Sequence, residues 1–150
     1  MKLPIFLDNH STSPMDPRVL ESMLPYFVEK FGNAASRNHA FGWAAEEGVE
    51  QARKQIAKLI KADSKEIVFT SGATESINLA LKGAAAARAG TRDHLILAAT
   101  EHRAVLDTAQ ALASSGCTLS IVPVDGAGLV DPDAIRLAIG PRTLLVCVMA

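Results

Sequence analysis

A strand–turn–helix pattern around residues 67–88 constrains the fold of this chain more than any other feature. The apolar run 67–70 predicts a strand, the small residues 71–76 (Ser-Gly-Ala-Thr-Glu-Ser) predict a turn, and residues 77–88 predict a helix. The first N–H groups of a helix have no intrahelical partner, and the helix dipole favours negative charge there. The turn is therefore a candidate site for a phosphate or carboxylate, with the Thr74 hydroxyl as an extra donor.

A plain helix start explains the same residues without a ligand. Gly72 would be the N-cap, and Glu75 would occupy the third helical position and reach back to the cap. The Glu75 carboxylate would repel a phosphate unless it bends back toward the cap or faces away. The local pattern alone leaves both interpretations open.

The rest of the chain predicts an α/β fold. Two helices come first, one capped by Asp16 and Pro17 and ended by Gly32 and Asn33, the other over residues 42–60. After residue 67, apolar strands alternate with helices, which favours a mainly parallel sheet covered by helices on both faces. Strands are expected at 67–70, 94–98, 118–124 and 143–149, and helices at 74–88, at 102–114 and after Asp131.

Composition excludes several classes of function. The net charge of −1 and the dispersed basic residues give no reason to expect a nucleic acid or an anionic membrane as partner. No apolar run is long enough to span a bilayer. The four histidines lack metal-ligand spacing, so no metal site is expected. The two cysteines, Cys117 and Cys147, lie in apolar runs typical of buried, inert thiols, which fits a reducing cytoplasm.

Four segments together resemble the cysteine desulfurases, pyridoxal 5'-phosphate (PLP) enzymes of aminotransferase class V. The segments follow one another in the family's order and at its spacing, and the resemblance extends over most of the chain. They are residues 7–14 (Leu-Asp-Asn-His-Ser-Thr-Ser-Pro), 31–39 (Phe-Gly-Asn-Ala-Ala-Ser-Arg-Asn-His), 71–80 (Ser-Gly-Ala-Thr-Glu-Ser-Ile-Asn-Leu-Ala) and 100–107 (Thr-Glu-His-Arg-Ala-Val-Leu-Asp).

The resemblance implies a fold and an activity. The fold would be the PLP-dependent transferase fold of the aspartate aminotransferase type. Residues 1–15 would form an N-terminal arm that packs with the small domain, and residues 16–150 the first part of the PLP-binding large domain. The enzyme would remove sulfur from L-cysteine, releasing alanine and leaving an enzyme persulfide for iron–sulfur cluster or thio-cofactor synthesis. It would be a homodimer that passes sulfur to an acceptor or scaffold protein.

The resemblance also implies roles for individual residues. Ala73 and Thr74 would hold the PLP phosphate. His102 would stack on the PLP ring and move protons near the substrate, as the catalytic residue of this part of the chain. Asn33 and His39 would lie near the substrate pocket, although loop geometry alone explains them equally well.

The apolar run 143–149 at the end of the chain indicates the N-terminal part of a longer enzyme. By resemblance, the Schiff-base lysine and the nucleophilic cysteine would lie beyond Ala150, so these residues alone are expected to be inactive. Three alternatives stay open: another class V PLP enzyme, of the selenocysteine lyase or cysteine-sulfinate lyase type; a non-catalytic, truncated α/β domain; and a generic phosphate-binding α/β domain.

Overall fold

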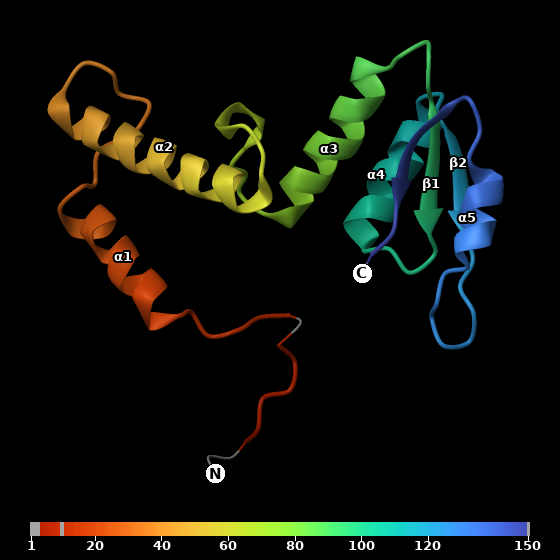
Figure 1. The fold of residues 1–150 in the computed structure, drawn as a ribbon, viewed down its shortest axis with the longest axis horizontal. Coiled ribbons are helices and arrows are strands. Elements are labelled where there is room, and N and C mark those ends of the chain that lie inside the picture. Colours follow the sequence, from red (N-terminus) through yellow and green to blue (C-terminus); the bar gives the residue numbers. More distant parts are fainter. Residues whose placement is uncertain (1–3, 10, 150) are drawn as a thin grey trace. The chain divides into compact units, whose positions relative to one another are not determined.

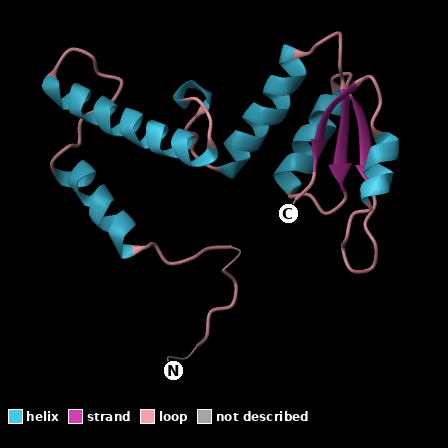
Figure 2. Ribbon diagram, viewed as in Figure 1, coloured by secondary structure: helices cyan, strands magenta, loops and turns pink. Residues whose placement is uncertain are grey.

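The computed structural model of the protein describes residues 4–9 and 11–149. The chain forms two compact units, Met1–Val68 and Phe69–Ala150, and each is considered by itself below. Figures 1 and 2 show the first unit as helical and the second as a small sheet with helices. The proposed division into an arm at 1–15 and a large domain from residue 16 stays a prediction.

The first unit contains helices α1 (Pro17–Val28) and α2 (Ala40–Ile60) and the short 3-10 turn η1 (Ser64–Glu66). The start of α1 confirms the sequence prediction: Asp16 is the N-cap, its side chain accepts the N–H of Arg18, and proline occupies the first helical position. The turn η1 follows α2, and Asp63 and Glu66 cap it reciprocally.

The predicted end of α1 at Gly32 and Asn33 is wrong. The N–H groups of Glu29 and Lys30 both donate to the carbonyl of Pro25, at 2.9 and 2.7 Å, and this closes the helix at Val28. Gly32 does not end the helix. It lies against Phe41, whose backbone carbonyl a Cβ at this position would overlap. The glycine therefore permits a close approach of two backbone segments.

The first turn of α2 also lies close to another backbone segment, the loop at Ser36. The helix begins at Ala40, two residues before the predicted start, because His39 is its N-cap and accepts the N–H of Gly42 at 3.1 Å. Gly42 itself lies against Ser36, whose carbonyl oxygen would overlap a Cβ at this position. The loop from Gly32 to Gly42 is thus folded tightly onto its own helix.

Replacing Gly42 with alanine is expected to lower the free energy of unfolding by about 1–3 kcal/mol, because the new methyl group meets backbone that cannot rotate away. Gly83→Ala is the matched control, since a Cβ at Gly83 in α3 (Ala73–Ala87) has nothing within 4 Å and alanine favours a helix. Thermal unfolding of the two full-length variants makes the comparison. Equal stability of the variants would contradict the close packing of Gly42.

The strand predicted at residues 67–70 is not formed. Ile67 has extended backbone, with φ −89° and ψ 123°, and its carbonyl accepts a hydrogen bond from the Arg53 guanidinium. No strand pairs with this segment within residues 4–9 and 11–149. An extended run becomes a strand only when a neighbour takes up its N–H and C=O groups.

The second unit is a parallel α/β structure, which confirms the predicted fold class. Its three strands lie in the order β2–β1–β3 and are all parallel. Figure 2 shows α4 and α5 on opposite sides of this sheet, and α3 packs against α4. The elements are α3 (Ala73–Ala87), β1 (His94–Ala98), α4 (Arg103–Ser114), β2 (Thr118–Val122), α5 (Pro132–Ala138) and β3 (Thr143–Cys147).

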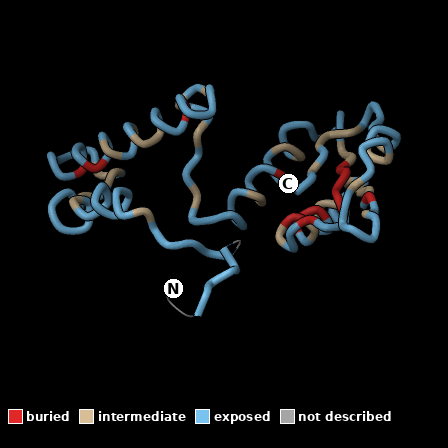
Figure 3. Tube along the Cα trace, turned by 60° about the horizontal axis from the view of Figure 1, so that its bottom comes forward, coloured by how far each residue is buried: buried red, intermediate tan, exposed pale blue. Residues whose placement is uncertain are grey.

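The core of the second unit is centred on β1. Residues Leu95 to Ala98 are fully buried, because β1 is the middle strand and helices cover the sheet. Figure 3 shows the buried residues of this unit as red stretches of the trace. Alternate side chains point to opposite faces of a strand. The face with Leu95 and Leu97 packs in one cluster with side chains of two helices, namely Leu81, Val105 and Ala109.

Candidate functional site

The turn before α3 has the features expected of an anion site. Helix α3 begins at Ala73 with Gly72 as its N-cap, and no side chain caps it from that position. Open space surrounds Gly72, where a Cβ would have nothing within 4 Å. Thr74 is exposed, and its hydroxyl makes no hydrogen bond to any residue that the structure describes. The helix N-terminus and this hydroxyl are therefore available to an anionic group.

Glu75 does not fill this position with its own carboxylate. Its Oε2 accepts hydrogen bonds from the hydroxyl and the backbone N–H of Ser71, at 2.6 and 2.7 Å. The carboxylate bends back as the sequence suggested, but to the residue before the N-cap rather than to Gly72. These two hydrogen bonds, the hydroxyl first, hold the pKa of Glu75 below its usual value, so the group is ionised.

Further hydrogen bonds brace the same turn. The hydroxyls of Thr70 and Ser76 lie 2.6 Å apart, and the Thr70 hydroxyl also donates to the carbonyl of Gly72 at 3.2 Å. The amide of Asn78 donates to the carbonyl of Thr74 at 2.9 Å. The turn is thus held by side chains on both sides of Gly72, while Ala73 and Thr74 stay open.

His102 stands at the carboxyl end of β1, where the sequence placed it. It is the N-cap of α4, it is exposed, and its Nδ1 accepts the backbone N–H of Ala104 at 3.1 Å. A ring nitrogen that accepts a hydrogen bond carries no proton, so the ring proton of a neutral His102 is on Nε2. Nε2 has no protein partner in the described part of the chain.

The phosphate turn and His102 belong to one end of the second unit. Helices α3 and α4 pack against each other, and in Figure 1 both begin at the end of the sheet toward which β1 points. Ala73 and Thr74 open the first of these helices, and His102 caps the second. In open α/β sheets, ligands bind at this carboxyl edge.

Asn33 and His39 lie in the first unit, in the loop between α1 and α2. The Asn33 side-chain oxygen accepts the N–H of Ala35 at 2.9 Å, while its NH2 group makes no hydrogen bond to the residues described. His39 caps α2, and its ring packs edge-on against Phe41 with centroids 6.3 Å apart. Both side chains accept a hydrogen bond from a nearby backbone N–H, and both are exposed.

Sequence reasoning missed Glu101, the residue before His102. Its side chain is buried, with 8% exposed, and its Oε2 accepts a hydrogen bond from the Cys147 thiol at 3.8 Å. Burial, with a smaller contribution from Glu101, raises the pKa of Cys147, so this thiol stays protonated. Glu101 lies inside the segment 100–107 that carries the family resemblance, but nothing in its local pattern indicates burial.

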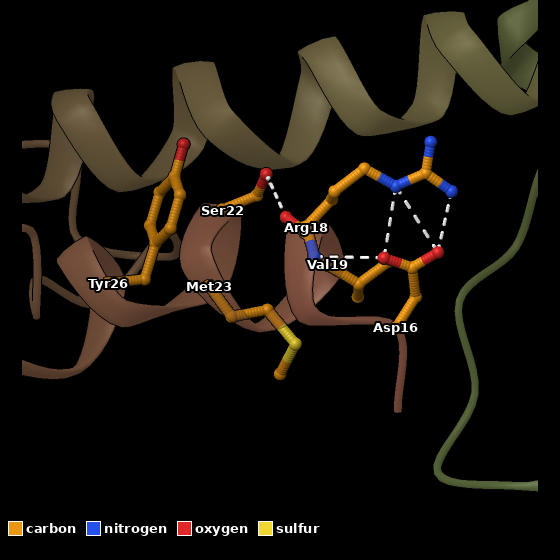
Figure 4. A pocket seen from close by; sticks show the side chains of 6 residues that line it. All are labelled: Asp16, Arg18, Val19, Ser22, Met23 and Tyr26. Carbon is orange, nitrogen blue, oxygen red and sulfur yellow. Dashed lines mark hydrogen bonds and ion pairs between the residues drawn. The ribbon is translucent and has the colours of Figure 1, made fainter. Parts of the chain in front are cut away.

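A hollow of about 440 Å³ along α1 contains none of the expected site residues. Its lining residues are Asp16, Arg18, Val19, Ser22, Met23 and Tyr26 (Figure 4). The polar groups among them already serve the helix: Asp16 caps it and pairs with Arg18, and the Ser22 hydroxyl donates to the Arg18 carbonyl. Since these polar groups are already engaged within the helix, the hollow is a poor candidate for a ligand site.

Within the described ranges, no three His, Cys, Asp or Glu side chains gather as a metal ion would require. In the same residues, no helix has the length and apolar character needed to cross a membrane.

Comparison with known proteins assigns the family. The family model "Aminotransferase class-V" matches residues 5–150. The chain is 54% identical to the cysteine desulfurase IscS of Anaeromyxobacter sp. (strain K) and 55% identical to that of Methylococcus capsulatus (strain ATCC 33009 / NCIMB 11132 / Bath), each over 99% of this chain. It spans 37% of the length of these relatives.

Solved structures agree with this assignment. A NifS-like protein superimposes with a TM-score of 0.87 at 39% identity, over 95% of this chain and 39% of its own. The structure titled "SspA in complex with cysteine" superimposes with a TM-score of 0.83 at 37% identity, over 94% of this chain and 40% of its own. The chain belongs to the aminotransferase class-V family.

Proposed function

We propose that the full-length protein is a PLP-dependent cysteine desulfurase, which converts L-cysteine to alanine and leaves the sulfur as an enzyme persulfide. The observation that carries this proposal is the identity of 54–55% to proteins named cysteine desulfurase, over almost every residue of the chain. The solved relative described as a complex with cysteine supports L-cysteine as the substrate.

The residues present fit PLP, the cofactor of this family. The uncapped start of α3, the space around Gly72 and the open Thr74 hydroxyl suit a phosphate group. Ala73 and Thr74 would hold this phosphate, and His102 would cover the ring. PLP, when bound, withdraws electrons from the substrate carbon, while the protein supplies orientation and electrostatics.

His102 is the residue of this segment that we assign to proton transfer. Its Nδ1 is engaged by the Ala104 N–H, and this hydrogen bond orients the ring and assigns its proton to Nε2. Nε2 is then the atom that carries the proton next to the substrate and can donate it. To accept a proton at Nε2, the ring would first have to release the Ala104 N–H and carry its own proton on Nδ1. A neutral ring suits stacking, since it brings no charge onto the face of the cofactor.

We assign Asn33 and His39 to the substrate side of the site. Asn33 retains a free NH2 group while its oxygen holds the loop, so it can donate to the carboxylate of an amino acid. His39 fixes the loop by capping α2 and presents its ring beside Phe41.

Asn33→Asp separates the two tasks of Asn33. Aspartate keeps the oxygen that accepts the Ala35 N–H, so stability should not change, but it replaces the NH2 donor by a negative charge. Losing a hydrogen bond to a charged group corresponds to roughly a tenfold rise in KM for L-cysteine. Steady-state kinetics measures this rise, and an unchanged KM would assign Asn33 to loop geometry alone.

We extend the proposal to the partners of the full-length protein and to its location in the cell. The full-length protein would be a homodimer that passes its persulfide sulfur to an acceptor or scaffold protein for iron–sulfur cluster or thio-cofactor synthesis. Cys117 and Cys147 stand unpaired, which fits the reducing cytoplasm. Since the Cys147 thiol is held protonated, the persulfide is expected on a different cysteine.

The test uses the purified full-length protein with PLP. L-cysteine should be converted to equal amounts of alanine and, in the presence of a reducing thiol, sulfide. L-selenocysteine and L-cysteine sulfinate serve as competing substrates that distinguish the related lyases. A protein that binds PLP but releases no alanine from L-cysteine would refute the proposed activity.

A further inference from the structure

The most unusual buried group in the second unit is the carboxylate of Glu101. Its residue is 8% exposed, and its Oε1 is buried without a hydrogen-bond partner among the residues that the structure describes. A buried carboxylate oxygen without a donor destabilises a fold, and an apolar side chain of similar size would suit the position better if packing were its only task. This residue therefore requires an explanation beyond packing.

Glu101 connects the turn that carries His102 to the end of a neighbouring strand. Its N–H donates to the carbonyl of Ala98 at 3.2 Å, which closes the turn after β1. Its Oε2 accepts from the thiol of Cys147, the last residue of β3. Cys147 is the register partner of Leu97 in β1, so the contact joins the carboxyl ends of two adjacent strands.

The start of α4 depends on the same turn. His102 follows Glu101 directly, and its ring is oriented by the hydrogen bond from Ala104. Rotation of the turn would change both the direction of the ring and the geometry of this hydrogen bond. The carboxylate is the group that ties the turn to β3.

From this geometry we infer that Glu101 is a positioning residue for His102: its buried carboxylate, held by the Cys147 thiol, fixes the turn that aims the imidazole. The inference rests on the proposed role of His102. Oε1 is a second buried acceptor at the same turn, and no donor to it lies among the described residues.

Glu101→Met and Glu101→Gln distinguish positioning from packing. Methionine fills the same space without polar atoms, so the global melting temperature should be unchanged or higher. Glutamine keeps an acceptor oxygen and can place its NH2 group against the Cys147 sulfur, so it should preserve the turn. Asp107→Asn is the matched control, because Asp107 is an exposed carboxylate on α4, the helix that His102 caps.

The first readout is hydrogen exchange of residues 99–106 in the full-length, PLP-free protein. Glu101→Met should accelerate exchange in this segment at least about tenfold, because the Ala104 N–H loses its fixed acceptor. The second readout is kinetics with PLP bound: kcat should fall roughly ten- to a hundredfold while KM stays within about twofold. Glu101→Gln and Asp107→Asn should match the wild type in both.

The outcomes are distinguishable. Wild-type exchange and wild-type kcat in Glu101→Met would overturn the inference, and so would a Glu101→Gln variant as impaired as Glu101→Met in a folded protein. If Glu101→Met does not fold, Cys147→Ala breaks the same contact from β3 and must accelerate the same exchange. A wild-type protein without desulfurase activity would refute the proposed function, whereas the exchange result tests the role of Glu101 in the turn independently.

Discussion

Replacing His102 with alanine is expected to lower kcat for L-cysteine by roughly two to three orders of magnitude, the contribution of a positioned acid–base group. The reason is chemical, because alanine offers no nitrogen in place of Nε2 and no ring to cover the cofactor. PLP should still bind, since the phosphate turn is a separate segment. Steady-state kinetics of the full-length protein, with PLP content measured on the same samples, checks the expectation.

His102→Asn controls for the loss of the helix cap. Alanine removes the acceptor for the Ala104 N–H and should lower the free energy of unfolding by about 1 kcal/mol, whereas asparagine is a good N-cap. The asparagine variant should therefore recover stability but not turnover. If His102→Asn recovered turnover together with stability, His102 would be a capping residue only.

Replacing Thr74 with alanine is expected to weaken PLP binding about ten- to a hundredfold, because one hydrogen bond to a charged phosphate contributes roughly 1.5–3 kcal/mol. The Thr74 hydroxyl has no partner within the described chain, so its removal leaves no other group unsatisfied. The fold should be unaffected, since alanine is well tolerated in a helix. Equilibrium dialysis of PLP against the full-length protein measures the change.

Thr74→Ser is the matched control for this prediction. Serine keeps the hydroxyl and loses only the methyl group, so its PLP affinity should stay close to that of the wild type. Equal affinity of the alanine variant and the wild type would remove Thr74 from the phosphate site and leave only the backbone N–H groups of the turn.

Elements that depend on near neighbours in the chain were predictable from the sequence. Asp16 and Asp131 were identified as N-caps because each precedes a proline that suits the first helical position. The strand at His94–Ala98 was predicted with its observed bounds, because a short apolar run between polar turns is typical of a buried strand. His102 was placed correctly at the end of that strand for the same local reason.

Errors occurred where distant residues decide the outcome. The segment 67–70 has the composition of a strand but does not form one in the structure. Gly32 has the pattern of a helix stop, yet the backbone of Phe41 is what requires a glycine there.

The sequence by itself determined the α/β class, the family and the candidate residues Ala73, Thr74 and His102, because these depend on local patterns and on four short segments. Tertiary structure alone decided that the Glu101 side chain is buried and accepts a hydrogen bond from Cys147. The physical reason is that burial and hydrogen bonding depend on which segments meet in space, and Cys147 meets Glu101 across 46 residues of chain.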